Sequence, residues 1–329
     1  MRPVLSFRSI LSALVLSMLG VASTGSALAQ TNYPDKPVRF VVPYPPGGGT
    51  DVIARIVQDR FQALLGQPII IDNKGGAGGS VGSELAARAA PDGYTVLFTL
   101  SSHTINPAIY PKLSFDTIKD FESIGTVASL PQILVANPQV PANTVAELVA
   151  LAKAKPELLA YASVGNGSPG HLAGELFKLR TGTQMTHIPY RGGGPAVTDV
   201  ISGQVPLLWV SIPAAAQFVK AGKLKALAVS TLKRSAAFPD VPTVQETGVP
   251  DFEVDSWYAM FVPARTPQPV IDRLNRTLNT IVAEPGIRDK LLAQGAEGVG
   301  GTPQTLTRIV AAEIPKWAKL AKDANIKAD

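Results

Sequence analysis

The chain reads Val38-Arg-Phe-Val-Val-Pro-Tyr-Pro-Pro-Gly-Gly-Gly-Thr-Asp51 near its beginning, and this run joins three kinds of local structure. Its first five residues are mostly apolar and β-branched, which favours a buried strand. The prolines and glycines that follow predict a turn, and from Thr50 onward apolar residues recur at helical spacing until Gly66. A strand, a glycine-rich turn and a helix in this order are typical of an α/β protein with a parallel sheet.

Further strand and helix signals follow along the chain. Thr144 and Glu147 form a capping box, while Ser168 and Pro169 mark the start of another helix. The expected strands lie at residues 68–71, 94–100, 159–163, 185–189, 205–210 and 224–230, and residues 267–283, 287–294 and 303–324 are expected to be helical.

Two extended segments bounded by proline, residues 128–136 and 252–262, bracket the second set of these units. We interpret them as two strands that cross between lobes, so that the C-terminal helices return to the first lobe. The predicted lobes are residues 30–130 plus 253–329 and residues 131–252. Two tandem domains are the alternative.

Residues 1–29 have the pattern of a secretory signal peptide. Arg2 and Arg8 give a basic start, an apolar run follows, and Ala27-Leu-Ala29 precedes Gln30. The apolar run is shorter than the roughly 18 residues that a membrane span requires, although an uncleaved anchor is the alternative. We therefore expect an exported protein of a bacterial periplasm.

The composition excludes several classes of protein. Of the 329 residues 46% are hydrophobic and 17% are charged, which is unlike a disordered chain. The absence of cysteine excludes a disulfide scaffold, a thiolate metal site and a cysteine nucleophile. Without Arg2 and Arg8 the formal net charge falls from +5 to +3, and we expect no nucleic-acid partner. His103, His171 and His187 lack the spacing of a metal site, so no metal is expected.

Four strand-to-helix joints share one design, with Gly, Pro or Ser before a helix start: residues 43–51, 100–107, 163–171 and 190–196. In a parallel sheet such joints lie at the carboxyl ends of the strands, where ligands bind. Free N–H groups at helix starts attract anions, and glycines let the backbone approach the ligand closely.

Side chains at these joints add neutral hydrogen-bonding groups suited to carboxylate oxygens, while Arg191 adds a cation. Tyr44, Tyr190 and Trp257 are candidate walls. Each of these features also has a structural explanation. Thr50 and Ser168, for example, are good helix caps. Asp51 would repel an anion, so it either caps its own helix or meets an ammonium group of the ligand. The neutral candidates are Thr50, Ser101, Ser102, Thr104, Asn106, Asn166 and Ser168.

Several catalytic patterns are missing from the chain. The turn 44–50 lacks the lysine of a P-loop, and the glycines of residues 75–82 lack the acidic partner of a dinucleotide site. No serine stands at the centre of a nucleophile elbow. A secreted hydrolase that pairs Ser101 or Ser102 with His103 is the alternative function.

Several motifs in fixed order resemble one family of proteins, over residues 33 to the C-terminus. It is the Bug family, also named TctC, of tripartite tricarboxylate transporter substrate-binding proteins. The motifs are Val41-Val-Pro-Tyr-Pro-Pro-Gly-Gly-Gly-Thr-Asp51, Pro91-Asp-Gly-Tyr94, Tyr161-Ala-Ser-Val-Gly-Asn-Gly-Ser-Pro-Gly-His-Leu-Ala-Gly-Glu175, His187-Ile-Pro-Tyr-Arg-Gly-Gly-Gly-Pro-Ala196, Phe238-Pro-Asp-Val-Pro-Thr243 and Trp257-Tyr-Ala-Met-Phe-Val-Pro-Ala264.

The resemblance implies an α/β fold of two lobes, a type II-like periplasmic binding protein with a mainly parallel sheet in each lobe and two crossing strands as hinge. It implies a monomeric receptor without catalysis or cofactor, which closes on a small carboxylate: a dicarboxylate, a tricarboxylate, an aromatic acid or an acidic amino acid. Membrane transporter subunits are the implied partners, and a sensor kinase is a second candidate. The implied ligand-binding residues are Tyr44, Pro46, Gly47, Gly48, Gly49, Thr50, Asp51, Ser101, Asn106, Ser163, Asn166, Gly167, Ser168, His171, Arg191 and Gly192.

Overall fold

The computed structural model describes residues 33–110, 112–190 and 193–326, so the predicted signal peptide lies outside the described residues. The chain divides after Asp35 into two units, and every helix and strand named below belongs to the second, Lys36–Asp329. The elements up to the first long strand are β1 (Val38–Val42), α2 (Gly49–Leu65), β2 (Ile69–Asn73), η1 (Ala77–Gly79), α3 (Ser80–Ala87), β3 (Thr95–Leu100), α4 (Ser102–Ile109) and β4 (Phe121–Ala136).

The middle of the chain contains short strands and helices in alternation, and the C-terminal part is mostly helical. The middle elements are α5 (Val145–Ala154), η2 (Pro156–Leu158), β5 (Ala160–Ser163), α6 (Pro169–Thr181), β6 (Thr186–Pro189), α7 (Gly193–Ile201), β7 (Leu207–Ser211), α8 (Ile212–Lys220), β8 (Lys225–Val229) and η3 (Gln245–Thr247). The last are β9 (Asp255–Pro263), α9 (Gln268–Ala283), α10 (Pro285–Ala293), β10 (Glu297–Gly300) and α11 (Pro303–Asp323).

The first group of strands lies around β1, which pairs in parallel with β2 and β3. β3 continues antiparallel to β9, and β9 and β10 both pair antiparallel with the first part of β4. Phe40 of β1 packs against Phe61 of α2 and Phe98 of β3, with ring centroids 5.3 and 6.2 Å away. These three rings are fully buried and lie at the centre of the part of the molecule built around β1, which we call the first half. The part built around β5 is called the second half.

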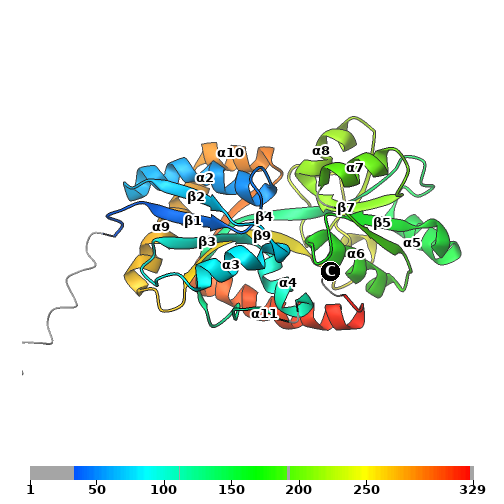
Figure 1. Ribbon diagram of the computed structural model, residues 1–329. Coiled ribbons are helices and arrows are strands. Elements are labelled where there is room, and N and C mark those ends of the chain that lie inside the picture. Colours follow the sequence, from blue (N-terminus) through cyan, green and yellow to red (C-terminus); the bar gives the residue numbers. More distant parts are fainter. Residues whose placement is uncertain (1–32, 111, 191–192, 327–329) are drawn as a thin grey trace, which may run out of the picture. The chain divides into compact units, whose positions relative to one another are not determined.

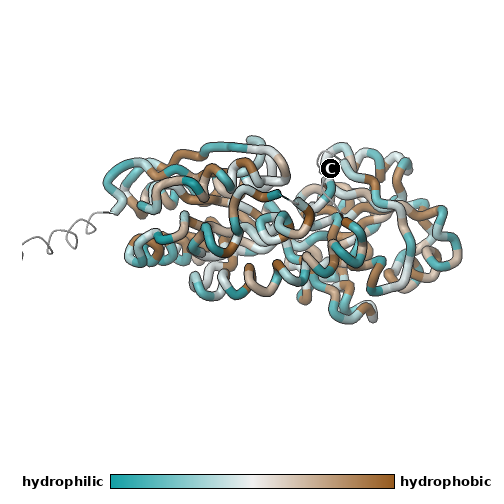
Figure 2. The backbone as a smooth tube through the Cα atoms, turned by 60° about the horizontal axis from the view of Figure 1, so that its bottom comes forward, coloured by the Kyte–Doolittle hydropathy of each residue, from teal (hydrophilic) through white to brown (hydrophobic). Residues whose placement is uncertain are grey.

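The second group has the same plan around β5, which pairs in parallel with β6 and β7. The second part of β4 pairs antiparallel with β7 on one edge and with β8 on the other. Trp209 of β7 stacks on Phe252 at 5.8 Å, and Phe177 of α6 lies 6.3 Å from both rings. Apolar and hydrophilic segments alternate along the backbone of both halves (Figure 2).

Two extended segments connect the halves. Residues 121–131 of β4 pair with β9, and its residues 132–136 pair with β7 (Figure 1). The second segment starts beside β8, where Val254 N–H donates to Ser230 O at 2.9 Å, and it continues as β9 in the first group. The predicted α/β fold with two lobes and two crossing strands is therefore confirmed, while the lobe boundaries stay predictions.

The C-terminal helices return to the first half, but the last one also reaches the second. α9 packs against α2 and β4, and α11 packs against α4 and β4. Trp317, Leu320 and Ile326 near the end of α11 belong to the buried cluster that contains Trp209. The end of the chain thus stabilises both halves.

Three elements differ from the sequence expectation. β4 begins at Phe121, whereas the sequence predicted an extended segment only from residue 128. Residues 121–127 mix apolar residues with polar residues and glycine, so they lack the apolar run typical of a buried strand. α4 occupies a segment rich in Ser, Thr, Asn and Pro that was expected to be a loop. Its apolar residues Ile105 and Ile109, one helical turn apart, are both buried. β10 is rich in glycine and pairs only at the edge of β4.

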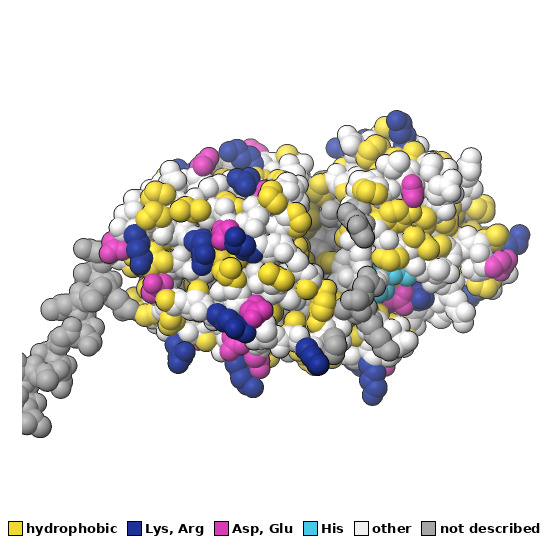
Figure 3. Space-filling view, in the orientation of Figure 1, with side chains coloured by type: hydrophobic (Ala, Val, Ile, Leu, Met, Phe, Trp, Pro, Cys, Tyr) yellow, Lys and Arg dark blue, Asp and Glu magenta, His cyan; other side chains and the backbone are white. Residues whose placement is uncertain are grey.

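The surface of the described part is mixed in character. In Figure 3 basic and acidic side chains intermix on the half around β1, and hydrophobic atoms cover much of the half around β7. Among the described helices, none combines the length and the apolar character that a bilayer crossing requires.

Candidate functional site

The first joint of the predicted site leads from β1 into α2. α2 starts at Gly49, and its first turn has no side-chain cap. Val52 N–H donates to Gly48 O at 3.0 Å, but within the described residues no acceptor receives the N–H groups of Gly49, Thr50 and Asp51. Unpaired N–H groups at a helix start carry partial positive charge and are suited to an anion.

Asp51 contributes one of these N–H groups, but its side-chain carboxylate is already bonded within the chain. One oxygen accepts from Gly47 N–H and from Arg55 Nε, both at 2.9 Å, and the other accepts from Asn73 Nδ2 at 3.1 Å. Burial acts to raise the pKa of Asp51, but the bonds from Arg55, Gly47 and Asn73 outweigh it and hold the pKa below its usual value. The geometry therefore gives Asp51 a role in fixing the turn 43–48.

Tyr44 connects this turn to the next joint. Its hydroxyl is 2.6 Å from Ser102 Oγ at the start of α4, and its carbonyl accepts from Asn73 Nδ2 at 3.1 Å. Burial raises the pKa of Tyr44, partly opposed by the bond with Ser102, so the phenol stays protonated at neutral pH. Tyr44 thus links the turn after β1 to the start of α4 and to the end of β2.

The second joint leads from β3 into α4 and contains an unused donor. Ser101 is 1% exposed, and its Oγ has no hydrogen-bond partner among the described residues. A buried hydroxyl without a partner costs free energy unless a ligand or water satisfies it. Asn106, by contrast, donates to Gly78 O at 3.0 Å and holds α4 against the turn before α3.

The third joint, between β5 and α6, is bonded internally. Ser163 Oγ lies 2.7 Å from His187 Nε2 and also bonds with the backbone of Gly165. Ser168 Oγ accepts from His171 N–H at 3.2 Å and caps α6, as its structural alternative predicted.

His171 completes this internally bonded turn. Its Nδ1 accepts from Gly167 N–H at 3.1 Å, and its ring stacks on His187 at 3.8 Å. Burial lowers the pKa of His171 to about 4, with a smaller contribution from Lys178, so the ring is neutral and accepts this bond. Asn166 lies half-buried between Gly165 and Gly167. Arg191 and Gly192 of the fourth joint lie outside the described residues.

The joints of the two halves meet at Gly167. A Cβ at this position would overlap the side chain of Ile109 at the end of α4. The backbone of Gly167 also has φ of +69°, which favours glycine. Close approach of backbone and side chain here brings the turn before α6 against the helix that follows Ser101.

His103, the histidine that the alternative serine hydrolase would use, lies in an aromatic cluster of the core. The His103 ring packs among Phe115, Phe121 and Phe261, and neither of its nitrogens has a partner among the described residues. Burial lowers the pKa of His103 to about 3. His103 is therefore a neutral core residue, and it does not activate Ser101.

The predicted walls also have other contacts. Trp257 is 3% exposed and donates from Nε1 to Glu313 of α11 at 3.1 Å, so it faces away from α2. Tyr190 donates from its hydroxyl to Asp199 at 2.7 Å. The neighbouring Tyr258 was missed by sequence reasoning, although alternation along a strand places consecutive residues on opposite faces. Its hydroxyl lies 2.9 Å from the position that a Cβ of Gly49 would take.

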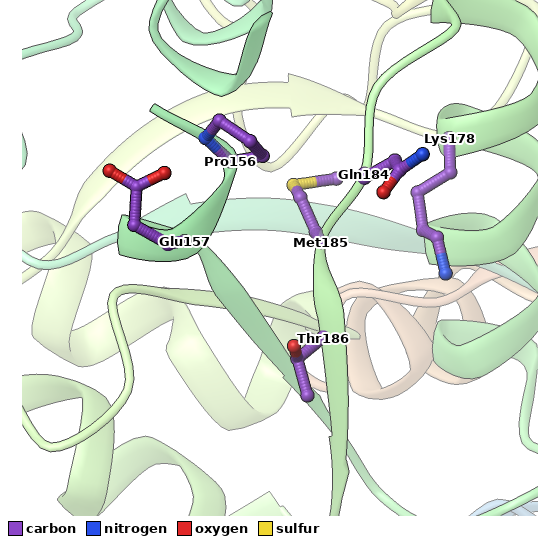
Figure 4. A pocket seen from close by; sticks show the side chains of 6 residues that line it. All are labelled: Pro156, Glu157, Lys178, Gln184, Met185 and Thr186. Atoms are coloured by element: carbon purple, nitrogen blue, oxygen red, sulfur yellow. The ribbon is translucent and has the colours of Figure 1, made fainter. Parts of the chain in front are cut away.

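A separate pocket of about 450 Å³ lies at the amino ends of β5 and β6, opposite the ends that carry the joints (Figure 4). Its lining residues include Glu157, Lys178 and Met185. Lys178 is already paired with Glu175 at 2.8 Å. The described residues contain no group of three or more acidic or histidine side chains placed to hold a metal ion.

Two α/β halves joined by crossing strands, with helix starts gathered at the carboxyl ends of parallel strands, define a two-lobe periplasmic binding protein. The chain belongs to the TctC family, described as the tripartite tricarboxylate transporter family receptor, whose sequence profile matches residues 53–326.

Individual relatives cover nearly the whole chain. BugT of Bordetella pertussis is 36% identical over 319 residues, which are 96% of this chain and 98% of BugT. Rpa4515 of R. palustris, solved with adipate, has 36% identity and a TM-score of 0.81, covering 90% of this chain and 100% of its own. MatC of Rhodopseudomonas palustris, solved with bound malate, has 32% identity and a TM-score of 0.76, covering 88% and 99%.

Proposed function

We propose that this protein is an exported receptor that captures a small carboxylate between its two halves and delivers it to a transporter of the tripartite tricarboxylate type. The observation that carries the proposal is a set of unused donors at adjacent joints: the N–H groups of Gly49, Thr50 and Asp51, and the hydroxyl of Ser101. β1 and β3 are neighbouring parallel strands, so both joints lie at the same edge of the sheet.

Neutral donors of this kind suit a carboxylate. A helix start and a buried hydroxyl stabilise negative charge without a fixed cation, and they do so more strongly when water is excluded. Closure of residues 131–252 over residues 30–130 plus 253–329 would exclude that water, with β4 and the segment ending in β9 as hinge. The turn at Gly167, already in contact with Ile109, would cover the ligand.

The donors and the ligands of similar structures support the proposed ligand class. Structures similar to this chain contain adipate and malate, so dicarboxylates are the first candidates, followed by tricarboxylates, aromatic acids and acidic amino acids. The receptor is proposed to act as a monomer in the periplasm after removal of residues 1–29, without cofactor or catalysis. Its client is a set of membrane transporter subunits, or a sensor kinase.

A thermal-shift screen of the chain from Gln30 onward tests the proposal, using these four ligand classes. A ligand at about 100 times its Kd should stabilise the protein by ~2.7 kcal/mol, which raises Tm by several degrees. Isothermal titration should then give one site per chain and an unchanged ligand. Turnover of ester or amide substrates would favour the hydrolase, and a screen without any shift, on protein unfolded and refolded to remove bound ligand, would contradict the receptor.

A further inference from the structure

The strand β9 places one aromatic side chain toward α2 and the preceding one toward α11. Tyr258 pairs with Leu100 of β3 on one edge of β9 and with Ala128 of β4 on the other. Trp257 contacts Glu313 of α11, whereas the Tyr258 hydroxyl lies at the first residue of α2, 2.9 Å from the Cβ position of Gly49. The phenol of Tyr258 is therefore aimed at the helix start whose N–H groups are unused.

The hydroxyl of Tyr258 is itself an unused donor. Tyr258 is 4% exposed, and its hydroxyl makes no hydrogen bond within the part of the chain that the structure describes. Burial, and to a lesser degree Tyr44, raises the pKa of Tyr258, so its proton is retained at neutral pH. The hydroxyl of a tyrosine that is otherwise buried usually has a partner, and here its position beside the first residue of α2 points to a group that arrives with the ligand.

A second unused hydroxyl lies at the same edge of the sheet. Ser101 follows Leu100 directly, and Leu100 is the residue paired with Tyr258. The pairing of β3 with β9 therefore brings the unpartnered hydroxyl of Tyr258 and the buried, unpartnered hydroxyl of Ser101 to the end of β3. The backbone N–H groups can only donate and both hydroxyls are able to donate, so an acceptor with several lone pairs would satisfy all of them at once.

We propose that Tyr258 is a ligand-binding residue, whose hydroxyl donates to the same carboxylate that the first N–H groups of α2 hold. The inference rests on the proposed function and adds a contact from the crossing strand itself. Because β9 connects the two halves, a ligand bound to Tyr258 touches the hinge directly.

Gly49 has a specific part in this arrangement. A methyl group at residue 49 would lie 2.9 Å from the Tyr258 hydroxyl but 4.0 Å from its ring carbon Cζ. Alanine at residue 49 thus displaces the hydroxyl, while a phenylalanine at residue 258 would accommodate the same methyl group at ordinary contact distance. The tyrosine oxygen therefore occupies the space that a side chain at residue 49 would need.

The first test compares the affinities of the parent chain and Tyr258→Phe for adipate and malate by isothermal titration. Loss of a hydrogen bond to a charged group should weaken binding by about 10- to 100-fold. The matched control is Tyr94→Phe, because Tyr94 directly precedes β3 at its opposite end. Thermal unfolding without ligand verifies that both variants fold.

The second test is a double-mutant cycle. Gly49→Ala alone should weaken binding by about tenfold, whereas Gly49→Ala added to Tyr258→Phe should cost little more. Gly286→Ala is the control, since Gly286 also lies in the first turn of a helix and a Cβ there meets nothing within 4 Å.

The outcomes separate the inference from the function on which it rests. A parent chain that binds while Tyr258→Phe binds equally well overturns the role of Tyr258 alone. Equal losses in Tyr258→Phe and Tyr94→Phe, or additive losses in the cycle, also overturn it. If the parent binds neither probe nor any other carboxylate of the screen, the proposed function fails and this inference with it.

Discussion

The joints of the two halves use the same residue types in opposite ways. In the first half, the N–H groups of Gly49, Thr50 and Asp51 and the hydroxyl of Ser101 have no partner among the described residues. In the second half, Ser168 caps α6 and His171 accepts from Gly167 N–H. The comparison teaches that similar glycine and serine joints can either bind a ligand or hold their own turn. In the binding mode proposed above, the first half makes the primary polar contacts with the ligand, and the second half covers it.

The largest expected effect concerns a feature that both halves share, a buried neutral histidine. The pKa of His103 is about 3 and that of His171 about 4 in the folded protein, whereas an unfolded histidine titrates near 6.5. The unfolded state therefore binds protons first as pH falls. Each histidine should remove about 2.7 kcal/mol of unfolding free energy between about pH 7 and pH 4.5.

Two substitutions separate these histidines. His103→Phe should flatten the acid dependence at little cost near pH 7, because the ring nitrogens of His103 have no partner in the described part. His171→Phe should flatten it too, but with a cost at neutral pH from the unpaired Gly167 N–H. Urea unfolding between pH 4.5 and 7.5 measures both, and an unchanged acid slope in His103→Phe would contradict the assignment.

The next largest effect is expected at Ser101. Ser101→Ala should weaken carboxylate binding by about 2 kcal/mol, the value of a hydrogen bond to a charged group. The free energy of unfolding without ligand should change little, since the hydroxyl has no partner among the described residues. Titration calorimetry and urea unfolding of the same protein give both numbers, and a stability loss without an affinity loss would reverse the assignment.

A smaller effect concerns the amino group of a ligand. Asp51 already accepts from Gly47, Arg55 and Asn73, so it has little capacity left for an ammonium group. Succinate should therefore bind about tenfold more tightly than aspartate, and glutarate more tightly than glutamate, because a buried unpaired ammonium is costly. Competition titrations with these pairs decide the matter, and tighter binding of either amino acid would show that Asp51 reaches the ligand.

The smallest effect belongs to the second half. Ser168→Ala should lower the free energy of unfolding by ~1 kcal/mol through loss of the α6 cap, with an affinity change of less than about threefold. Ser168→Thr is the control, since it keeps the capping oxygen. If Ser168→Ala weakened binding as strongly as Ser101→Ala, the two joints would not differ in the way described above.

Much of the fold could be predicted from sequence because its elements have strong local signals. The run 38–51, the capping box at Thr144 and the Ser168-Pro169 helix start all correspond to observed elements. α4 was missed because Ser, Thr, Asn and Pro favour turns locally, while burial of Ile105 decides for a helix. Such tertiary effects leave no periodic pattern in eight residues.

The candidate site was harder to predict for a related reason. Sequence indicates that a hydroxyl or a carboxylate lies at a joint, but not which partner within the chain already uses it. Asn106, Ser163 and Asp51 are all engaged by other residues, and Tyr258 is distinguished from Trp257 only by the pleat of β9. Pairing between distant segments decides availability, and that pairing becomes visible only in three dimensions.

The shared strand β4 has a consequence for how this protein can be divided. Its last residues are the common neighbour of β7 and β8, so a fragment that began after residue 136 would leave two strands with open edges. Open edges of this kind favour aggregation. Fragments, domain exchanges and circular permutants of this receptor should therefore keep β4 intact within the expressed chain.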